Sequence, residues 1–187
     1  MSKEQVLLHA CCATCSGYVL EKISLEYTPV LYYFNPNIYP SEEYMLRRNE
    51  LKNYAFIKNV DFIEENYDPE SWFNFIKGLE NEPEKGLRCY YCFYFRLQKT
   101  ALLALKNNIT HFTTTLTISP HKNSKTILDI GRKIAADNNL LFLAEDYKKR
   151  DGYRKTIEIA KTQNFYRQNY CGCIFSNKLI PYSLPML

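Results

Sequence analysis

The seven cysteines of this chain are the residues best suited to chemistry, and they fall into three short clusters. The clusters are Cys11, Cys12 and Cys15, then Cys89 and Cys92, then Cys171 and Cys173. Secreted disulfide scaffolds are usually shorter and scatter their cysteines. Clustered pairs in a cytosolic chain are typical of metal ligands or redox-active thiols. The spacing therefore predicts metal or redox chemistry in a cytoplasmic protein.

The first two clusters each lie where a helix is expected to begin. Amide groups and the positive end of the helix dipole stabilise thiolates there, and the thiolate is the form that binds metal. Cys89 and Cys92 have a C-x2-C spacing that suits zinc, an iron–sulfur cluster or a dithiol redox centre equally well. The adjacent Cys11 and Cys12 do not reproduce the C-x2-C knuckle of a structural zinc site. We therefore expect an iron–sulfur cluster in preference to zinc.

The third cluster differs because a single residue, Gly172, separates Cys171 from Cys173. Two thiols at this spacing can close only a small, strained ring, and strained, exposed disulfides are the labile, catalytic kind. The alternatives are two further metal ligands or two small buried hydrophobic residues. The spacing favours a pair that exchanges between dithiol and disulfide.

Two histidines lie in positions that suit chemistry. His121 follows a Ser-Pro turn, where it acts as a general acid or only caps the helix that follows. His9 ends an apolar strand directly before the first cysteines, where it is either a neighbour of a metal ligand or a hydrogen-bonded core residue. Of the two, His121 is the candidate catalytic residue.

Four further residues are candidates for substrate binding. Tyr33 lies in an aromatic-rich strand, where a core position is the default interpretation. Asn35 and Asn37 belong to the turn directly beyond that strand, and Arg88 precedes the C-x2-C motif. Their places in the chain, rather than their chemistry alone, put them close to the cysteines.

The elements that position these residues alternate between strand and helix. Short apolar strands are expected at residues 6–8, 29–34, 60–63, 112–116 and 140–143. Helices are expected at residues 16–25, 41–58, 68–78, 89–106, 123–136 and 152–162, with Ser41 and Asp68 as N-caps. This alternation predicts an α/β fold, a three-layer sandwich with a parallel five-stranded sheet. Ligands bind beyond the carboxyl ends of such strands, so the first cysteines and the turns at residues 35–37 and 119–121 should converge.

Composition and charge limit the class of protein and its partners. A chain of 187 residues with 46% hydrophobic residues predicts one globular α/β domain over residues 1–187, and no apolar run approaches a membrane span. Residues 1–87 hold 8 Lys or Arg against 14 Asp or Glu, whereas residues 88–187 hold 16 against 6. A C-terminal half with a net charge of +10, together with 16 Tyr and 11 Phe in the chain, suits RNA. The other reading is that these charges are spread over solvated helix faces.

Seven motifs between about residues 5 and 176 resemble, in order, the cobalamin-independent epoxyqueuosine reductases of the QueH family. They are His9-Ala10-Cys11-Cys12-Ala13-Thr14-Cys15, Tyr33-Phe34-Asn35-Pro36-Asn37-Ile38, Glu42-Glu43-Tyr44 with Arg47, Arg88-Cys89-Tyr90-Tyr91-Cys92 with Arg96-Leu97, Thr113-Thr114-Thr115-Leu116, Ser119-Pro120-His121-Lys122 and Tyr170-Cys171-Gly172-Cys173. Each motif is weak alone, and the set is specific. Some members carry Asp at the position of Cys15, and many carry proline at that of Thr14.

The resemblance implies an activity and its partners. Epoxyqueuosine, a modified guanosine at the wobble position of a tRNA anticodon, is reduced to queuosine in the last step of queuosine biosynthesis. The epoxide becomes an alkene with loss of water, which consumes two electrons and two protons. The implied partners are the tRNA anticodon stem-loop and an electron donor such as ferredoxin or flavodoxin, with no membrane involved.

The resemblance also implies a fold and a site. The fold is similar to the nucleotide-α-hydrolase-like (HUP or PP-loop-like) class, without its phosphate loop. The implied ligands of a 4Fe–4S cluster are Cys11, Cys12, Cys89 and Cys92. Cys15 is a possible extra ligand, with room for a second, mononuclear iron, and Cys171 with Cys173 forms a redox-active disulfide.

Two other functions remain open on the sequence. A zinc-stabilised tRNA-binding module without catalysis uses the same thiols and is colourless. A PP-loop-like tRNA-modifying sulfurtransferase needs an ATP-binding loop of the Ser-Gly-Gly type after the first strand, and here the cysteines occupy that place.

Overall fold

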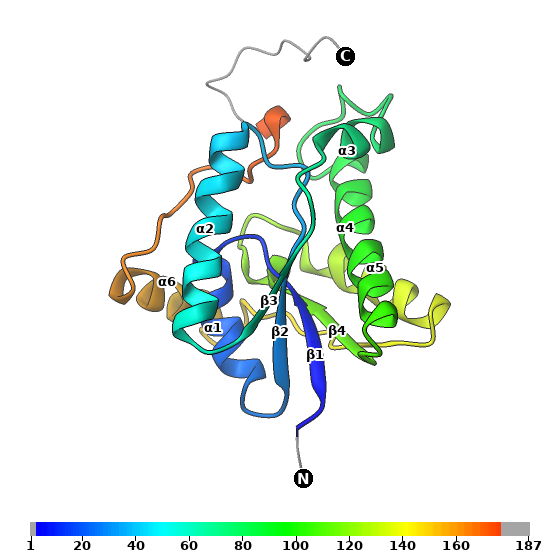
Figure 1. Ribbon diagram of the computed structural model, residues 1–187. Helices are drawn as coiled ribbons and strands as arrows, with labels where there is room; N and C mark the ends of the chain where they lie inside the picture. Colours follow the sequence, from blue (N-terminus) through cyan, green and yellow to red (C-terminus); the bar gives the residue numbers. More distant parts are fainter. Residues whose placement is uncertain (1–2, 177–187) are drawn as a thin grey trace.

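A computed structural model describes residues 3–176 of the chain and contains a five-stranded parallel sheet (Figure 1). The strands are β1 (Gln5–His9), β2 (Thr28–Tyr33), β3 (Asp61–Glu64), β4 (His111–Thr114) and β5 (Leu141–Phe142), in the order β3-β2-β1-β4-β5. Register pairs Leu7 with Val30 of β2 and with Phe112 of β4. The predicted five-stranded parallel sheet is confirmed.

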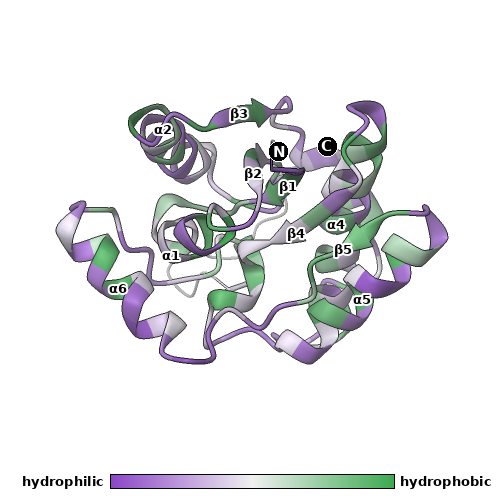
Figure 2. Cartoon of the chain, turned by 90° about the horizontal axis from the view of Figure 1, so that it is seen from below, coloured by the Kyte–Doolittle hydropathy of each residue, from purple (hydrophilic) through white to green (hydrophobic). Residues whose placement is uncertain are grey.

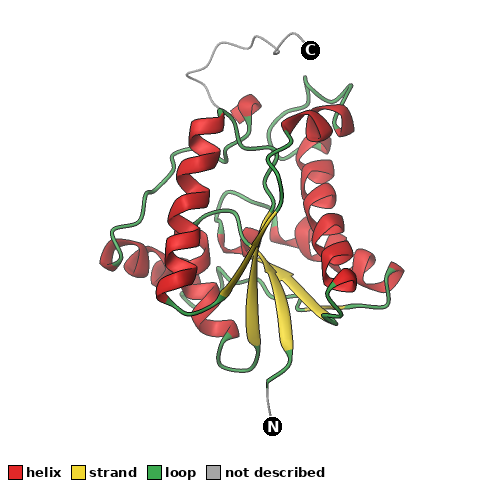
Figure 3. Ribbon diagram, in the orientation of Figure 1, coloured by secondary structure: helices red, strands yellow, loops and turns green. Residues whose placement is uncertain are grey.

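Helices cover both faces of this sheet (Figure 3). They are α1 (Ala13–Ile23), α2 (Ser41–Ile57), α3 (Pro69–Phe75), α4 (Leu87–Lys106), α5 (Ser124–Asp137) and α6 (Gly152–Thr162), with short 3₁₀ turns at Thr115–Ile118 and Ile174–Ser176. Helix α1 packs against α2 and α6 on one face, and α4 packs against α3 and α5 on the other. The structure is therefore the three-layer α/β sandwich that the alternation predicts.

The strands are buried because helices cover both sides of the sheet. Val6, Leu7 and Leu8 of β1 are completely buried, the near-continuous apolar run expected of a central parallel strand. Hydrophilic residues lie instead along much of α5 and α6, as Figure 2 shows from below. No helix within residues 3–176 has the length and apolar character needed to cross a membrane.

Three local predictions need correction, and one cap is confirmed. Pro40 rather than Ser41 is the N-cap of α2, and Ser41 is its first helical residue. The strand expected to reach residue 116 ends at Thr114, because the chain turns into a 3₁₀ helix. Helix α1 begins three residues earlier than expected. Asp68 caps α3 as predicted, accepting a hydrogen bond from the Ser71 amide at 3.1 Å.

The strand order reverses between β1 and β4, which lie side by side although about 100 residues separate them. Crevices at such switch points are where α/β sheets bind ligands. The turn after β1 holds the first cysteines and the turn after β4 holds Thr115, whose Oγ1 accepts a hydrogen bond from the Cys11 amide at 3.3 Å. The fold thus places the predicted chemistry at its switch point.

Candidate functional site

The turn between β1 and α1 gathers three thiols. The Sγ atoms of Cys11, Cys12 and Cys15 all lie within 4.8 Å of one another, and these side chains are 7%, 1% and 8% exposed. Cys15 joins the adjacent pair because one helical turn brings residue i+3 back beside the cap of the helix. The predicted cluster of thiols is therefore a compact, buried group.

Hydrogen bonds hold this three-thiol group at the start of α1. Cys12 is the N-cap of α1, and its Sγ accepts hydrogen bonds from the Cys15 amide at 3.3 Å and from Nε2 of Gln168 at 3.2 Å. Hydrogen bonds from the thiols of Cys12 and Cys15 hold the pKa of Cys11 well below its usual range, and the Lys122 cation acts in the same direction. Cys11 is the member of the group best disposed to be a thiolate, as expected at a helix N-terminus.

Two buried arginines bring positive charge to this group, and sequence reasoning gave neither of them a role. Arg96 of α4 is 3% exposed and donates to the side-chain oxygen of Asn35, whose Nδ2 in turn donates to the Ala10 carbonyl at 2.9 Å. Arg47 of α2 is 1% exposed and forms an ion pair with Glu43 at 2.6 Å. Both arginines belong to the motifs of the family resemblance, which is the one signal that singled them out.

A strap formed by residues 166–173 crosses the thiol group from a distant part of the sequence. Tyr166 and Gln168 attach it to the start of α1, because Thr14 donates to the Tyr166 carbonyl at 2.9 Å and Gln168 donates to Cys12. Arg47 donates to the carbonyls of residues 170 and 171 at 3.3 and 3.4 Å. The strap is therefore attached to the three-thiol group at one end and carries Cys171 and Cys173 past it at the other.

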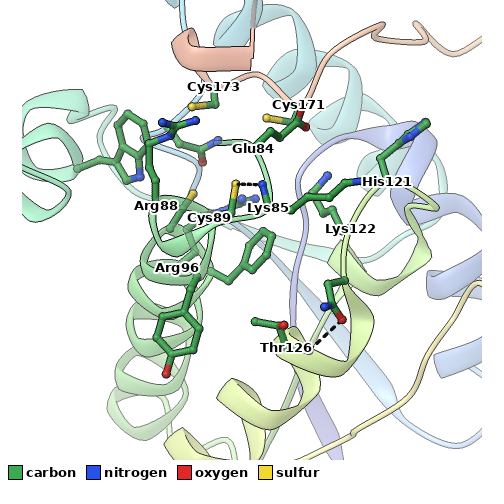
Figure 4. A pocket seen from close by; sticks show the side chains of 16 residues that line it. Glu84, Lys85, Arg88, Cys89, Arg96, His121, Lys122, Thr126, Cys171 and Cys173 are labelled. Carbon is green, nitrogen blue, oxygen red and sulfur yellow. Dashed lines mark hydrogen bonds between the residues drawn. The ribbon is translucent and has the colours of Figure 1, made fainter. Parts of the chain in front are cut away.

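The other four cysteines line a compact cavity of about 50 Å³ (Figure 4). Cys89 and Cys92 come from the first turns of α4, and Cys171 and Cys173 come from the strap. A hydrogen bond with the Cys173 thiol lowers the pKa of Cys171 to about 5, whereas burial raises the pKa values of Cys89 and Cys92. Cys89 accepts a hydrogen bond from the Lys85 amide at 3.2 Å.

A wider cleft of about 600 Å³ opens beside the three-thiol group. Cys11 and Cys15 form part of its wall, together with residues of α6 and the strap. Cys171, His121 and Lys122 line both the cleft and the compact cavity, so the two spaces adjoin. The predicted convergence of the first cysteines with the turn at residues 119–121 is confirmed, while Asn37 of the third turn lines the compact cavity.

The four predicted cysteine ligands are divided between the three-thiol group and the compact cavity. Cys11 and Cys12 lie in the three-thiol group, together with Cys15. Cys89 and Cys92 lie on the compact cavity instead. All seven cysteines are free thiols, so the predicted Cys171–Cys173 disulfide is not formed in this structure. The ligand set and the redox exchange both stay predictions.

The histidines and the candidate substrate residues have different surroundings. His9 is a satisfied core residue: its Nε2 lies 3.2 Å from the Phe34 carbonyl and its Nδ1 lies 2.9 Å from Thr114 Oγ1. Because the carbonyl can only accept, Nε2 carries the proton and Nδ1 accepts from the hydroxyl. Burial lowers the pKa of His9 to about 3, which keeps the ring neutral. His121 is exposed at the boundary of the two cavities.

Among the four candidate substrate-binding residues, two form hydrogen bonds inside the protein core. Tyr33 is fully buried and donates to the Tyr44 carbonyl at 3.0 Å, while both polar atoms of Asn35 are hydrogen-bonded. Arg88 uses one Nη to hold carbonyls of the loop before α4, including that of Glu80 at 2.7 Å. Asn37 Oδ1 and Arg88 Nε are buried without a partner in the described structure, and both residues line the compact cavity.

The donor set fits a thiophilic metal or an iron–sulfur cluster. Thiolates are the ligands of iron–sulfur clusters and of structural zinc, and three cysteine sulfurs already lie within reach of one centre. Buried N–H groups aimed at cysteine sulfur, such as that of Gln168, stabilise the negative charge of metal-bound thiolates. The residues present therefore suit such a group.

A parallel α/β sheet whose switch point gathers thiols, buried arginines and an open cleft defines an enzyme of metal or redox chemistry. Comparison with known proteins agrees, because the profile of the epoxyqueuosine reductase QueH family matches residues 6–179. The chain belongs to this family and is an oxidoreductase.

Individual relatives support the assignment over most of both chains. The chain is similar to epoxyqueuosine reductase QueH of Acinetobacter baylyi, with 40% identity over 92% of this chain and 80% of that protein. Its identity with the Streptococcus pyogenes protein of the same name is 39%, over 95% and 72% of the two chains. Its identity with the Thermotoga maritima protein of the same name is 35%, over 91% of this chain and 89% of that protein.

Proposed function

We propose that this oxidoreductase reduces epoxyqueuosine to queuosine in tRNA at the cleft beside Cys11 and Cys15. The observation that carries the proposal is the buried three-thiol group at the switch point, next to a cleft of about 600 Å³, in a member of this family. A cleft of this size holds a nucleoside comfortably. The reaction takes up two electrons and two protons and converts the epoxide to an alkene and water.

The cofactor of the proposal is a 4Fe–4S cluster held by Cys11, Cys12, Cys89 and Cys92. Support comes from the donor types, from the position of both pairs at helix starts, and from the adjoining spaces that Cys11 lines on one side and Cys89 and Cys92 line on the other. Cys15, in contact with the first pair, is available for a second, mononuclear iron. When bound, such a cluster supplies electrons one at a time, which suits a two-electron reduction carried out in steps.

The chain's own residues supply charge and protons. Lys122 and Arg96 bring positive charge to Cys11, which favours a negatively charged sulfur and attracts a substrate that gains electrons. His121 lies on both cavities and is the proposed general acid toward the leaving oxygen. Asn37 and Arg88 line the compact cavity that adjoins the cleft, and their unpartnered buried atoms are proposed to contact the part of the substrate that reaches this cavity. Tyr33 and Asn35 support the site from the core.

Cys171 and Cys173 are proposed to store an electron pair. Oxidation of the two thiols to a disulfide releases two electrons and two protons, and a donor such as ferredoxin or flavodoxin returns the pair to the dithiol form. The hydrogen bond between the thiols supports this role, because a low thiol pKa favours thiol–disulfide exchange at neutral pH.

Anaerobic purification followed by iron and sulfide analysis and a visible spectrum tests the cofactor. A broad absorbance near roughly 400 nm is expected for the cluster. A colourless protein that contains zinc would support the tRNA-binding module without catalysis instead. Conversion of tRNA carrying epoxyqueuosine to the queuosine form, followed by mass spectrometry of the nucleosides, tests the reaction itself.

Single alanine substitutions separate the two possible ligand sets. Cys89→Ala and Cys92→Ala should each abolish the visible absorbance and the bound sulfide, whereas Cys15→Ala should keep the cluster spectrum. If instead Cys15→Ala removes the iron while Cys89→Ala keeps it, the three-thiol group alone is the metal site. The double change Cys171→Ser with Cys173→Ser should keep the spectrum and lose multiple turnover. Loss of the spectrum in this double variant would make the pair metal ligands.

A further inference from the structure

Residues of α6 and the strap line the wide cleft together with Cys11 and Cys15. Tyr153, Thr156 and Ile157 line it from the first turns of α6, and Arg167 lines it from the strap. Positions 153, 156 and 157 share one face of the helix, so they form a continuous surface. None of these residues has a part in the thiol chemistry proposed above.

Tyr153 presents an aromatic ring in this cleft. It is 38% exposed, whereas Cys11 and Cys15, which also line the cleft, are only 7% and 8% exposed. The other tyrosine on the cleft, Tyr170, has its ring against the Arg47 guanidinium at 5.4 Å and its hydroxyl bonded to the Tyr39 carbonyl. Tyr153 thus lies at the rim of the cleft, where a base outside the reaction centre would be placed.

Polar groups beside the ring point to a hydrogen-bonding ligand. Thr156 is 2% exposed, and its Oγ1 is buried without a hydrogen-bond partner in the described structure. Oε1 of Gln168 and Nε of Arg96, two other residues of the cleft wall, have no partner there either. A buried polar atom without a partner costs free energy, so three of them around one cleft indicate an absent ligand with donors and acceptors.

The charge around the cleft favours an anionic ligand. Arg167 is exposed on the strap, and it lines the cleft together with Tyr153 and Lys122. The loop before α4 carries Glu80, Glu82 and Glu84, and Glu84 itself lines the cleft together with Lys85. Cations still outnumber this carboxylate in the cleft lining, which includes Arg47, Lys85, Arg96, Lys122 and Arg167. An aromatic ring flanked by cations is the arrangement with which proteins hold single-stranded RNA, because bases stack on the ring and phosphates pair with the cations.

We propose that Tyr153, Thr156 and Arg167 form a subsite for the nucleotide next to the reacting nucleoside in a single-stranded RNA loop. Tyr153 stacks on the neighbouring base, Thr156 hydrogen-bonds the nucleotide, and Arg167 pairs with its phosphate. The reacting nucleoside then occupies the thiol end of the cleft, since the cleft is large enough for more than one nucleoside unit. This inference rests on the proposed function, and it adds the surface that holds the RNA strand in place.

Binding of a synthetic stem-loop RNA with the sequence of a tRNA anticodon arm tests the subsite. The probe carries ordinary guanosine at the wobble position, so binding is measured without the reaction. Fluorescence anisotropy with the full chain should show that Tyr153→Ala weakens binding about 5- to 150-fold, and that Tyr153→Phe binds like the unmodified protein. Tyr91→Ala is the matched control, because Tyr91 is 40% exposed on α4 and lies outside the cleft lining.

Salt dependence separates stacking from phosphate contact. Arg167→Gln should lower the slope of log affinity against log salt concentration by about one, whereas Tyr153→Ala should lower affinity with the slope unchanged. An RNA that lacks the base on one side of the wobble nucleotide should lose the same affinity as Tyr153→Ala, and the two changes together should lose no more. Two RNAs are tested, each lacking the base on one side of the wobble nucleotide. If the loss of affinity caused by Tyr153→Ala adds to the loss caused by the missing base for both RNAs, the stacking assignment is overturned.

Failure of this inference and failure of the proposed function give different results. If the unmodified chain reduces epoxyqueuosine in tRNA and Tyr153→Ala binds the stem-loop as tightly as Tyr91→Ala, the subsite is wrong and the function stands. If Tyr153→Ala loses binding in the manner described while the unmodified chain reduces no epoxyqueuosine, the subsite is supported and the function is wrong.

Discussion

The substitution Arg47→Gln tests whether the strap is held by a buried charge. Arg47 is 1% exposed, pairs with Glu43 at 2.6 Å and donates to two carbonyls of the strap. Its sequence neighbour Arg48 offers a matched control on the same helix, because it pairs with Glu64 near the surface and has a side chain that is 25% exposed. The two substitutions remove the same group from very different surroundings.

The expected magnitudes follow from burial. Removing one member of a buried ion pair leaves an uncompensated charge, here on Glu43, and costs about 3–5 kcal/mol. An exposed pair contributes about 0–1 kcal/mol, because water screens it, so Arg48→Gln should change the free energy of unfolding little. A difference of at least about 2 kcal/mol between the two variants is therefore expected.

Urea unfolding followed by circular dichroism measures this difference. With a slope of about 1–3 kcal/mol per molar urea, Arg47→Gln should shift the midpoint by at least about 1 M, and Arg48→Gln by a fraction of that. Replacing Glu43 as well, in Arg47→Met with Glu43→Leu, should recover part of the loss, because no buried charge remains unpaired. Equal midpoint shifts for the Arg47→Gln and Arg48→Gln variants would refute the reasoning.

Three further predictions concern backbone and core positions. Gly172 has φ +97°, and side-chain atoms lie 2.9 and 3.1 Å from where its Cβ would be; Gly78, at φ +88°, has open space there. Gly172→Ala should therefore cost more than the roughly 1–2 kcal/mol of left-handed strain expected for Gly78→Ala, in matched urea titrations. His9, with its pKa lowered to about 3, stays neutral in the folded chain while the unfolded chain takes up a proton below pH 6.5. The contribution of His9 should therefore lower the free energy of unfolding by about 2 kcal/mol as the pH falls from 7 to 5. His9→Gln should flatten the plot of unfolding free energy against pH over this range. Asn35→Leu should cost about 1–3 kcal/mol in thermal or urea unfolding, because the buried Arg96 then loses its acceptor; an unchanged midpoint would show that Arg96 finds another partner.

Much of the fold could be predicted because its signals are local. The alternation of short apolar strands with amphipathic helices is visible in the sequence, and α6 matches its predicted range of residues 152–162. The Asp-Pro pair at residues 68 and 69 predicts the start of α3, because capping depends on a few adjacent residues. The prediction of Ser41 as the N-cap of α2 was wrong, because Pro40 is the N-cap. A residue type that is favourable at an N-cap does not by itself determine where the helical backbone begins.

The candidate site could be predicted in its residue types and in part of its arrangement. Cys11, Cys12 and Cys15 gather because one helical turn relates them, which sequence spacing alone determines. The motifs also carried the family resemblance, which the comparison with known proteins confirms. The residue types available for chemistry and their local grouping can thus be predicted from the sequence.

Only the tertiary structure decided which distant residues meet at those thiols. Gln168 reaches Cys12 from 156 residues away, and Arg47 lies between the three-thiol group and the strap. Cys89 and Cys92 share a cavity with Cys171 and Cys173, while Tyr153 of α6 lines the cleft of the first thiols. Spacing along the chain carries no information about these contacts. They depend on which strands become neighbours and on how the helices pack over them, and this packing is decided by the burial of the whole core.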